Sequence, residues 1–249
     1  MQNGKIIRIA FLSFLVAVTS LGNGTTANAA PDFAHMNKKV TYCISCHHES
    51  GAGFNGAVPI PRLAGQTPEY LDAQIKAFAE HTRDNPNSKN FMWNAVHGMT
   101  AEEKAAVIKY FSDMKDTPPS GGAPSVDAKH LALGKEIFEH GVGNNVAACN
   151  MCHGEKGEGN GAIPSIAGQR YDYFLQAFHD WRHGFRKNAD PMPGYAKVMA
   201  NDKNEANDQI EALAQYLSTL KNNPNSKNSG SNKSDAEKED RDSDDADAR

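Results

Sequence analysis

The chain has 249 residues, with 26 basic and 30 acidic side chains and a formal net charge of −4 at pH 7. This length is sufficient for two domains of ordinary size. The acidic balance, together with the lack of a basic patch in the sequence, argues against nucleic-acid binding, because that function depends on clustered lysine and arginine side chains.

The first 29 residues have the pattern of a secretory signal peptide. Lys5 and Arg8 form a basic start, an apolar run from Ile9 to Val18 follows, and Ala-Asn-Ala at 27–29 provides a small-residue cleavage site. An uncleaved membrane anchor is the alternative, but the apolar run is shorter than the stretch of about 20 residues that spans a bilayer. We therefore expect residues 1–29 to be removed and the mature chain to be periplasmic.

Residues 31–115 form the first predicted domain, which is helical. A short helix is expected from Asp32 to Tyr42. Thr67 and Pro68 suit the N-cap and the first position of a longer helix. The apolar residues of that helix recur at helical spacing and are Tyr70, Leu71, Ile75 and Phe78.

The first domain is predicted to end in a capped helix and a linker. Thr100 and Glu103 have the spacing of a capping box. The apolar face of the helix that follows consists of Val107, Tyr110, Phe111 and Met114. Proline and glycine are frequent in residues 116–127, which predicts a linker without regular structure.

The second predicted domain, residues 128–221, repeats the first. It begins with a helix from Ala128 to His140. The segment Ile-Pro-Ser-Ile-Ala-Gly-Gln at 163–169 matches Ile-Pro-Arg-Leu-Ala-Gly-Gln at 60–66 in five of seven positions. The later helices repeat the apolar pattern with Tyr173, Phe174, Phe178 and Trp181, and then with Leu213, Tyr216, Leu217 and Leu220. Few segments have the pattern of strands, so the predicted fold is all-α, with two tandem domains.

The last segment, residues 222–249, is polar and slightly acidic. It contains almost no apolar side chains, so it cannot bury enough surface to offset the entropy of ordering. We predict a disordered acidic tail. A solvated tail is the simpler interpretation, and a tether or a lure for a basic partner is the alternative.

Two copies of the motif Cys-x-x-Cys-His, at 43–47 and 149–153, contain all four cysteines of the chain. This motif is the attachment signature of c-type haem. The two sulfurs form thioethers to the haem vinyl groups, and the adjacent histidine is thereby held under the iron. The motifs predict two covalently bound haem c groups, attached through Cys43, Cys46, Cys149 and Cys152, with His47 and His153 as axial iron ligands.

A second axial ligand for each iron should recur at equivalent positions of the two repeats. Two pairs of methionines do so, namely Met92 with Met192 and Met99 with Met199. Met99 directly precedes a capping residue, which favours a packing role for its pair. Met192 lies between two prolines, in what we expect to be an extended loop. We therefore predict Met92 and Met192 as axial ligands, on the precedent of His/Met-ligated cytochromes.

Histidine is the alternative second ligand. His81 and His97 have no counterparts in the second repeat, and His179 and His183 have none in the first. The recurrence therefore favours methionine, although a bis-histidine site in one repeat is left open.

Pro61 and Pro164 occupy equivalent positions after the two motifs. A histidine that binds a metal usually donates its other ring N–H to a carbonyl or carboxylate. We expect the carbonyls of these prolines to accept that bond, with a simple turn proline as the alternative.

These features resemble cytochrome c4, a family of two-domain dihaem class I cytochromes c. The resemblance covers about residues 31–221 and rests on the two haem motifs, the repeated Ile-Pro-x-Leu/Ile-Ala-Gly-Gln segment, and two aligned pairs, Tyr70 with Tyr173 and Met92 with Met192. It implies helical domains packed with their haem propionates close together. It also implies electron transport in the periplasm, from a membrane donor complex to a terminal oxidase or other acceptor. An association with the membrane surface is left open.

With both irons saturated, we expect outer-sphere electron transfer rather than catalysis. The alternatives are an electron-accepting subunit of a dehydrogenase, or a dihaem enzyme such as a peroxidase or thiosulfate dehydrogenase. A peroxidase needs a haem that can lose its distal ligand. Known thiosulfate enzymes use an axial cysteine, and no cysteine is left over here. A zinc or disulfide protein is disfavoured, because neither explains a histidine after each cysteine pair.

Overall fold

The computed structural model describes residues 36–54, 57–114, 127–187, 189–199 and 205–221. All of them belong to one of the two compact units of the chain. The predicted signal peptide (1–29), the tail (222–249) and nearly all of the linker (116–127) lie outside the described residues.

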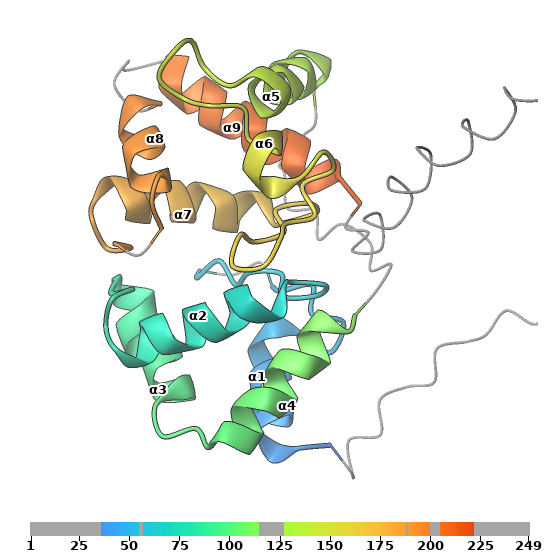
Figure 1. Cartoon of the computed structure of the whole chain (residues 1–249), viewed down its shortest axis with the longest axis vertical. Helices are drawn as coiled ribbons and strands as arrows, with labels where there is room; N and C mark the ends of the chain where they lie inside the picture. The colour runs from blue at the N-terminus through green and yellow to red at the C-terminus, as the bar shows by residue number, and fades with distance from the viewer. Residues whose placement is uncertain (1–35, 55–56, 115–126, 188, 200–204, 222–249) are drawn as a thin grey trace, which may run out of the picture. The chain divides into compact units, whose positions relative to one another are not determined.

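The described residues form two successive groups of helices (Figure 1). The first repeat contains α1 (Lys38–His47), α2 (Pro68–Ala79), a short π-helical segment η1 (Ser88–Trp93), α3 (Asn94–Val96) and α4 (Ala101–Ser112). The second contains α5 (Ala128–His140), α6 (Asn150–His153), α7 (Tyr171–Arg182), α8 (Met192–Val198) and α9 (Glu205–Thr219). In these residues β-structure is limited to isolated bridges, so the all-α prediction is confirmed.

Each repeat has its own hydrophobic core, and the predicted apolar faces form it. In the first repeat α1 and α2 pack against α4, and the core consists of Val40, Ile44, Leu71, Val107 and Phe111. In the second repeat α5 and α7 pack against α9. That core includes Phe138, Phe174, Phe178, Trp181, Leu213 and Leu217. No helix in the described parts of the chain has both the length and the hydrophobicity needed to cross a bilayer.

The predicted helix starts are only partly correct. Thr100 accepts a hydrogen bond from the backbone N–H of Glu103, and the Glu103 side chain accepts one from the backbone N–H of Thr100, so the capping box is confirmed. Pro68 is the first residue of α2, as predicted. Thr67 occupies the N-cap, but its side chain makes no capping hydrogen bond.

The first haem motif lies within a helix, which differs from our expectation of a short helix ending at Tyr42. Helix α1 begins at Lys38 and continues through the motif to His47. Residues 38–47 contain no glycine or proline, so nothing stops the helix before the cysteines. In the second repeat Gly141, with φ of 78°, ends α5 eight residues before the second motif begins.

Helices α5 and α9 cross at a glycine. A Cβ atom on Gly134 would lie far inside van der Waals contact with the carbonyl of Ala212 and within 2.7 Å of the Tyr216 Cβ. The neighbours are mainly backbone atoms, which cannot swing aside as a long side chain could. The close packing of these two helices therefore depends on the absence of a side chain at position 134.

We expect Gly134→Ala to lower the free energy of unfolding by at least about 1–3 kcal/mol, the usual cost of overpacking. Gly194→Ala is the matched control, because Gly194 lies in α8, is exposed and has no atom within 4 Å of the added Cβ. That variant should be neutral or slightly more stable, since alanine favours a helix. Guanidinium unfolding of the holoprotein, followed by circular dichroism, measures both. Equal stabilities of the two variants would contradict the crossing geometry.

Candidate haem sites

The histidines of both motifs are oriented by proline carbonyls. Nδ1 of His47 lies 3.0 Å from the Pro61 oxygen, and Nδ1 of His153 lies 2.8 Å from the Pro164 oxygen. A carbonyl can only accept, so each Nδ1 must carry the hydrogen. Each Nε2 then keeps its lone pair, which is the form that binds a metal.

Burial favours the same neutral form. Loss of solvent lowers the pKa of His47, and the nearby charge of Arg83 lowers it further, although the hydrogen bond to Pro61 opposes both. Burial also lowers the pKa of His153, against the opposing effect of its bond to Pro164. A histidine must be deprotonated to bind a metal. Because both imidazoles already favour the neutral form, little free energy is needed to remove a proton when they bind a metal.

Two glycines bring the proline segment back to its histidine. Gly53 and Gly159 have φ of 76° and donate hydrogen bonds to the carbonyls of His47 and His153. A Cβ at either position would overlap the returning backbone near the proline. Each glycine follows its histidine by six residues, a recurrence in the sequence that would have identified them.

None of the four cysteines forms a disulfide bond. Cys43 and Cys149 are half-buried, and burial raises the pKa of each to about 11. Cys46 and Cys152 are exposed. Each motif therefore presents one sulfur toward the interior and one toward the surface, next to an oriented histidine.

Of the four recurring methionines, only Met199 is fully buried. Met199 is 2% exposed within the core of the second repeat, and Met99 packs against the core of the first. Met92 and Met192 are half-buried, as Met99 is, and Met192 packs against the core of the second repeat. Met92 lies in η1 and Met192 at the first position of α8. The extended loop that we predicted around Met192 is therefore wrong. Pro193 is tolerated because the first turn of a helix does not need its N–H.

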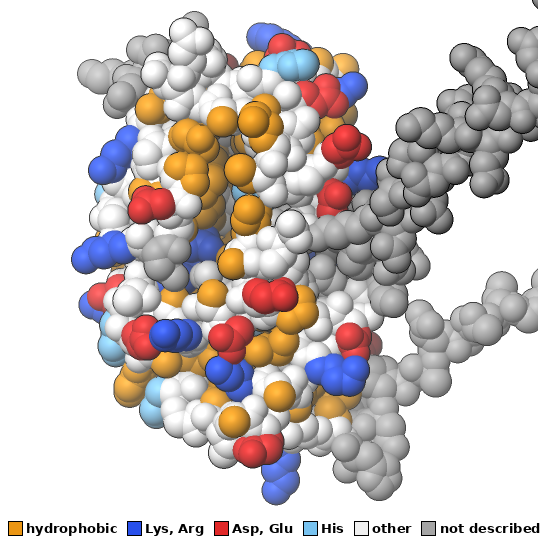
Figure 2. All heavy atoms as spheres, in the orientation of Figure 1, with side chains coloured by type: hydrophobic (Ala, Val, Ile, Leu, Met, Phe, Trp, Pro, Cys, Tyr) orange, Lys and Arg blue, Asp and Glu red, His pale blue; other side chains and the backbone are white. Residues whose placement is uncertain are grey.

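The second repeat has an apolar hollow between the elements that carry its predicted ligands. Figure 2 shows hydrophobic side chains lining this hollow, and comparison with Figure 1 places α8 on one side and α6 on the other. Met192 belongs to α8 and His153 to α6. A flat apolar group held by Cys149 and Cys152 fits this arrangement.

A family model for cytochrome c matches residues 23–115 and 131–221. The chain belongs to the cytochrome c family. The two tandem domains predicted from the sequence repeat are thereby confirmed, and the two cysteine pairs indicate two covalently bound haem c groups.

Several known proteins are similar over most of the chain. Cytochrome c-552 of Acidithiobacillus ferridurans is 32% identical over 213 residues, which cover 84% of this chain and 87% of that protein. The thiosulfate dehydrogenase electron acceptor of Thiomonas intermedia is 31% identical over 215 residues, 84% of this chain and 92% of that protein. A solved structure of Acidithiobacillus ferrooxidans cytochrome c4 is 34% identical, with a TM-score of 0.61, and covers 72% of this chain and 99% of that one. The chain is thus a dihaem electron carrier of the cytochrome c4 type, not an enzyme.

The repeated glutamines of this cytochrome join its two halves. Gln66 donates to the Ser165 carbonyl at 2.8 Å and accepts from the Ser165 N–H at 2.7 Å. Gln169 makes the same pair of bonds with Arg62, at 3.1 and 2.9 Å. Each glutamine therefore holds the residue that follows the histidine-binding proline of the other repeat. This contact supports the proline carbonyl, and sequence reasoning did not foresee it.

The buried charges of the protein are those expected around the negatively charged haem propionates. Of the described side chains, four arginines are buried and only one carboxylate is, these being Arg62, Arg83, Arg170, Arg186 and Asp180. Half-buried Asp172 lies 3.2 Å from Arg170, and Arg62 has interactions of its own, which leaves two buried arginines, Arg83 and Arg186, against Asp180. Unbalanced buried charge is costly. Propionate carboxylates would balance it.

Arg83 and Arg186 are the clearest candidates to hold those carboxylates. Arg83 donates to the Tyr173 hydroxyl at 2.7 Å, and Arg186 donates to the Tyr70 hydroxyl at 2.6 Å. The Nε of each is buried and lacks a hydrogen-bond partner in the described structure. Burial would raise the pKa of Tyr173, but the two guanidiniums outweigh it and the pKa is lowered. The site is therefore strongly positive, and two of its N–H donors, the Nε–H groups of Arg83 and Arg186, are available to a carboxylate.

Proposed function

We propose that this cytochrome transfers electrons in the periplasm, from a membrane donor complex to a terminal oxidase or other redox protein, by an outer-sphere route. Each iron would be held by a histidine and a methionine, His47 with Met92 and His153 with Met192. Each haem supplies a one-electron ferrous–ferric couple when bound, and sulfur ligation favours the ferrous state.

The observation that carries the proposal is the duplicated histidine–carbonyl contact. In each repeat a proline carbonyl fixes the tautomer of the motif histidine and leaves Nε2 free. A half-buried methionine, Met92 or Met192, occupies equivalent positions in the two sequences. Two protein ligands on each iron would leave no coordination position for a substrate.

The polypeptide has three tasks in this function. The cores and the buried prolyl segments orient the ligands and limit the access of water. The inter-repeat hydrogen bonds of Gln66 and Gln169 keep the two sites at a fixed separation. The guanidiniums of Arg83 and Arg186 favour the reduced state, because a nearby positive charge opposes a further positive charge on iron.

A second candidate role is to accept electrons from a thiosulfate dehydrogenase. The observation that favours it is the similarity to the Thiomonas intermedia acceptor, which extends over 92% of that protein. The chain would then have the same ligands and the same one-electron chemistry, and only the donor would differ. Stopped-flow reduction of the oxidised cytochrome by a thiosulfate dehydrogenase, compared with reduction by a quinol-oxidising membrane complex, separates the two roles.

We expect the holoprotein to contain two covalent haems and to show only low-spin iron. Mass spectrometry of the chain, produced with a haem-attachment system, should give the mass of the polypeptide from residue 30 plus two haems. The oxidised protein should show the near-infrared charge-transfer band of methionine bound to ferric iron. A high-spin signal, or turnover of peroxide, would contradict the proposed ligands.

A further inference from the structure

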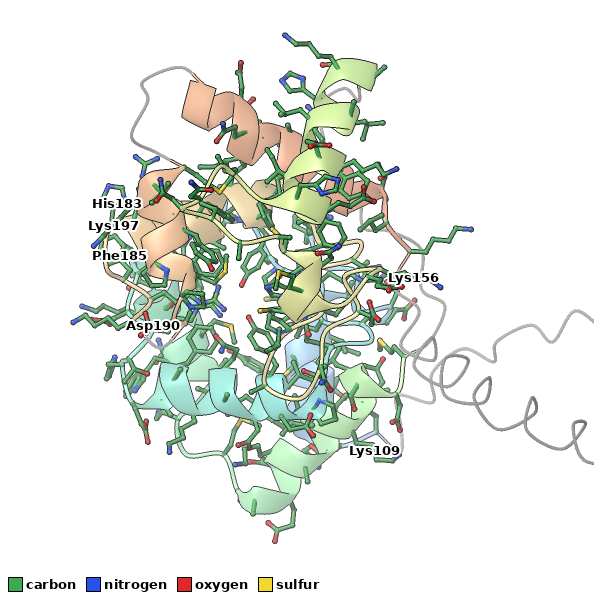
Figure 3. The ribbon with its side chains drawn as sticks, turned by 45° about the horizontal axis from the view of Figure 1, so that its top comes forward. Lys109, Lys156, His183, Phe185, Asp190 and Lys197 are labelled. Atoms are coloured by element: carbon green, nitrogen blue, oxygen red, sulfur yellow. The ribbon has the colours of Figure 1, made fainter. Side chains whose placement is uncertain are left out.

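Two exposed histidines lie one helical turn apart at the end of α7. His179 is in the last turn of the helix and His183 is its C-cap. Side chains at positions i and i+4 share one face of a helix. Their ring centroids are 4.0 Å apart with an interplanar angle of 27°. Figure 3 shows His183, with Phe185, at the outer edge of the molecule.

The orientation of His183 leaves one nitrogen available. Its Nδ1 lies 2.8 Å from the carbonyl oxygen of His179. That oxygen can only accept, so Nδ1 carries the hydrogen and Nε2 keeps its lone pair. The exposed ring therefore presents a metal-binding nitrogen in the form that a metal requires.

A carboxylate orients His179. Oδ1 of Asp180 lies 3.5 Å from Nδ1 of His179. Asp180 is itself held in place, because Asn85 and Gln176 donate hydrogen bonds to it. The Gln176 amide nitrogen, which can only donate, lies equally close to Nδ1 of His179, at 3.5 Å, so the free ring has both a donor and an acceptor beside that atom. When Nε2 binds a metal, the ring hydrogen moves to Nδ1 and the Asp180 carboxylate accepts it, as in carboxylate–histidine–metal arrangements.

The position also suits a cation electrostatically. The C-terminal end of a helix carries a partial negative charge. Arg182 and Glu211 both line the shallow hollow beside His179. Because their charges are opposite, they add little net charge to the surroundings of a bound cation. Two nitrogens on one ion are about 3 Å apart when the metal–nitrogen bonds are about 2.0–2.1 Å. The two rings are stacked, with centroids 4.0 Å apart, so these exposed side chains must rotate toward each other for both Nε2 lone pairs to meet on one ion.

We propose that His179 and His183 form a surface site for a divalent transition-metal ion of the copper, nickel or zinc type. Imidazole nitrogen suits these metals. The two Nε2 atoms bind the ion, and water completes its coordination. Neither histidine belongs to the predicted haem ligands, and this site is independent of the proposed electron-transfer partners.

The first repeat provides a matched control. Nδ1 of His97 lies 2.9 Å from the carbonyl of Trp93, also four residues earlier, so its Nε2 is free as well. The His97 ring stacks on Trp93 at 4.1 Å rather than on a second imidazole. His97 therefore reproduces the geometry of His183 without a second nitrogen ligand.

The test is the binding of Cu²⁺ to the fully oxidised holoprotein, in which no electron is available to reduce the copper. Equilibrium dialysis should give one bound ion, and its electron paramagnetic resonance spectrum should show two nitrogen ligands. His179→Gln and His183→Gln should each lose this ion, whereas His97→Gln should retain it. Unchanged haem absorption spectra verify that the variants are folded. Wild-type protein without bound copper, equal binding by the His183→Gln variant, or loss of the ion from the His97→Gln variant would overturn the proposal.

Discussion

Replacement of Met92 or Met192 by histidine is expected to lower one of the two reduction potentials and leave the other nearly unchanged. A thioether sulfur stabilises ferrous iron, whereas a second imidazole favours the ferric state. Axial ligands set haem potentials over a range of about 0.8 V, so the shift should be large. Each methionine belongs to a different repeat, so each variant should affect one haem. Spectroelectrochemical titration, fitted with two one-electron steps, measures the effect.

The other methionine pair is the control for this experiment. Met199 packs in the core of the second repeat and Met99 against the core of the first, and near-isosteric exchanges such as Met99→Leu and Met199→Leu cost less than about 1.5 kcal/mol. Both variants should retain both potentials and the near-infrared methionine band. Met92→His and Met192→His should each lose half of that band. A shifted potential in Met99→Leu, with none in Met92→His, would reverse the ligand assignment.

The repeat in the sequence explains why so much of the site could be predicted. A single methionine is uninformative, but Met92 and Met192 recur in register with two haem motifs. The same comparison identified Pro61 and Pro164, whose carbonyls lie beside Nδ1 of the two motif histidines. Residues that act on the same haem keep a similar spacing from its motif in both repeats, so a comparison of the two repeats can identify them.

The backbone around the methionines could not be predicted in the same way. The sequence Pro-Met-Pro favours extended structure locally, yet Met192 begins α8. Met92 lies in the π-helical turn η1, which requires packing against α2 and α3 and has no sequence pattern of its own. In both places tertiary contacts outweigh local preference.

The contacts between the repeats were missed for a different reason. Arg83 and Arg186 each follow an aligned tyrosine, Tyr70 or Tyr173, by 13 residues, so their recurrence was visible. A lone arginine after a helix is normally a surface residue. These two are buried because each donates to the tyrosine of the opposite repeat. Their role therefore depends on the pairing of two domains, which the sequence of either domain alone does not reveal.

Replacement of Arg186 by methionine is expected to lower both reduction potentials and to weaken the contact between the repeats. The side chain is 3% exposed, donates to Tyr70 and Gln74, and lies over the Trp181 ring at 4.9 Å. Removal of its positive charge leaves the charge of a nearby propionate carboxylate uncompensated. The uncompensated negative charge stabilises ferric iron. A unit charge about 12 Å away, at an effective dielectric constant of about 20, contributes about 1.4 kcal/mol. The potentials should therefore fall by tens of millivolts.

Arg186→Lys separates the effect of charge from that of geometry. Lysine keeps the positive charge but cannot reproduce the planar guanidinium that reaches two acceptors at once. The lysine variant should therefore retain both potentials while its free energy of unfolding falls, because the bond to Tyr70 is weakened. The methionine variant should show both changes. Potentials that fall equally in the two variants would mean that packing, rather than charge, sets them. Unchanged potentials in the methionine variant would show that this guanidinium does not act on the haems.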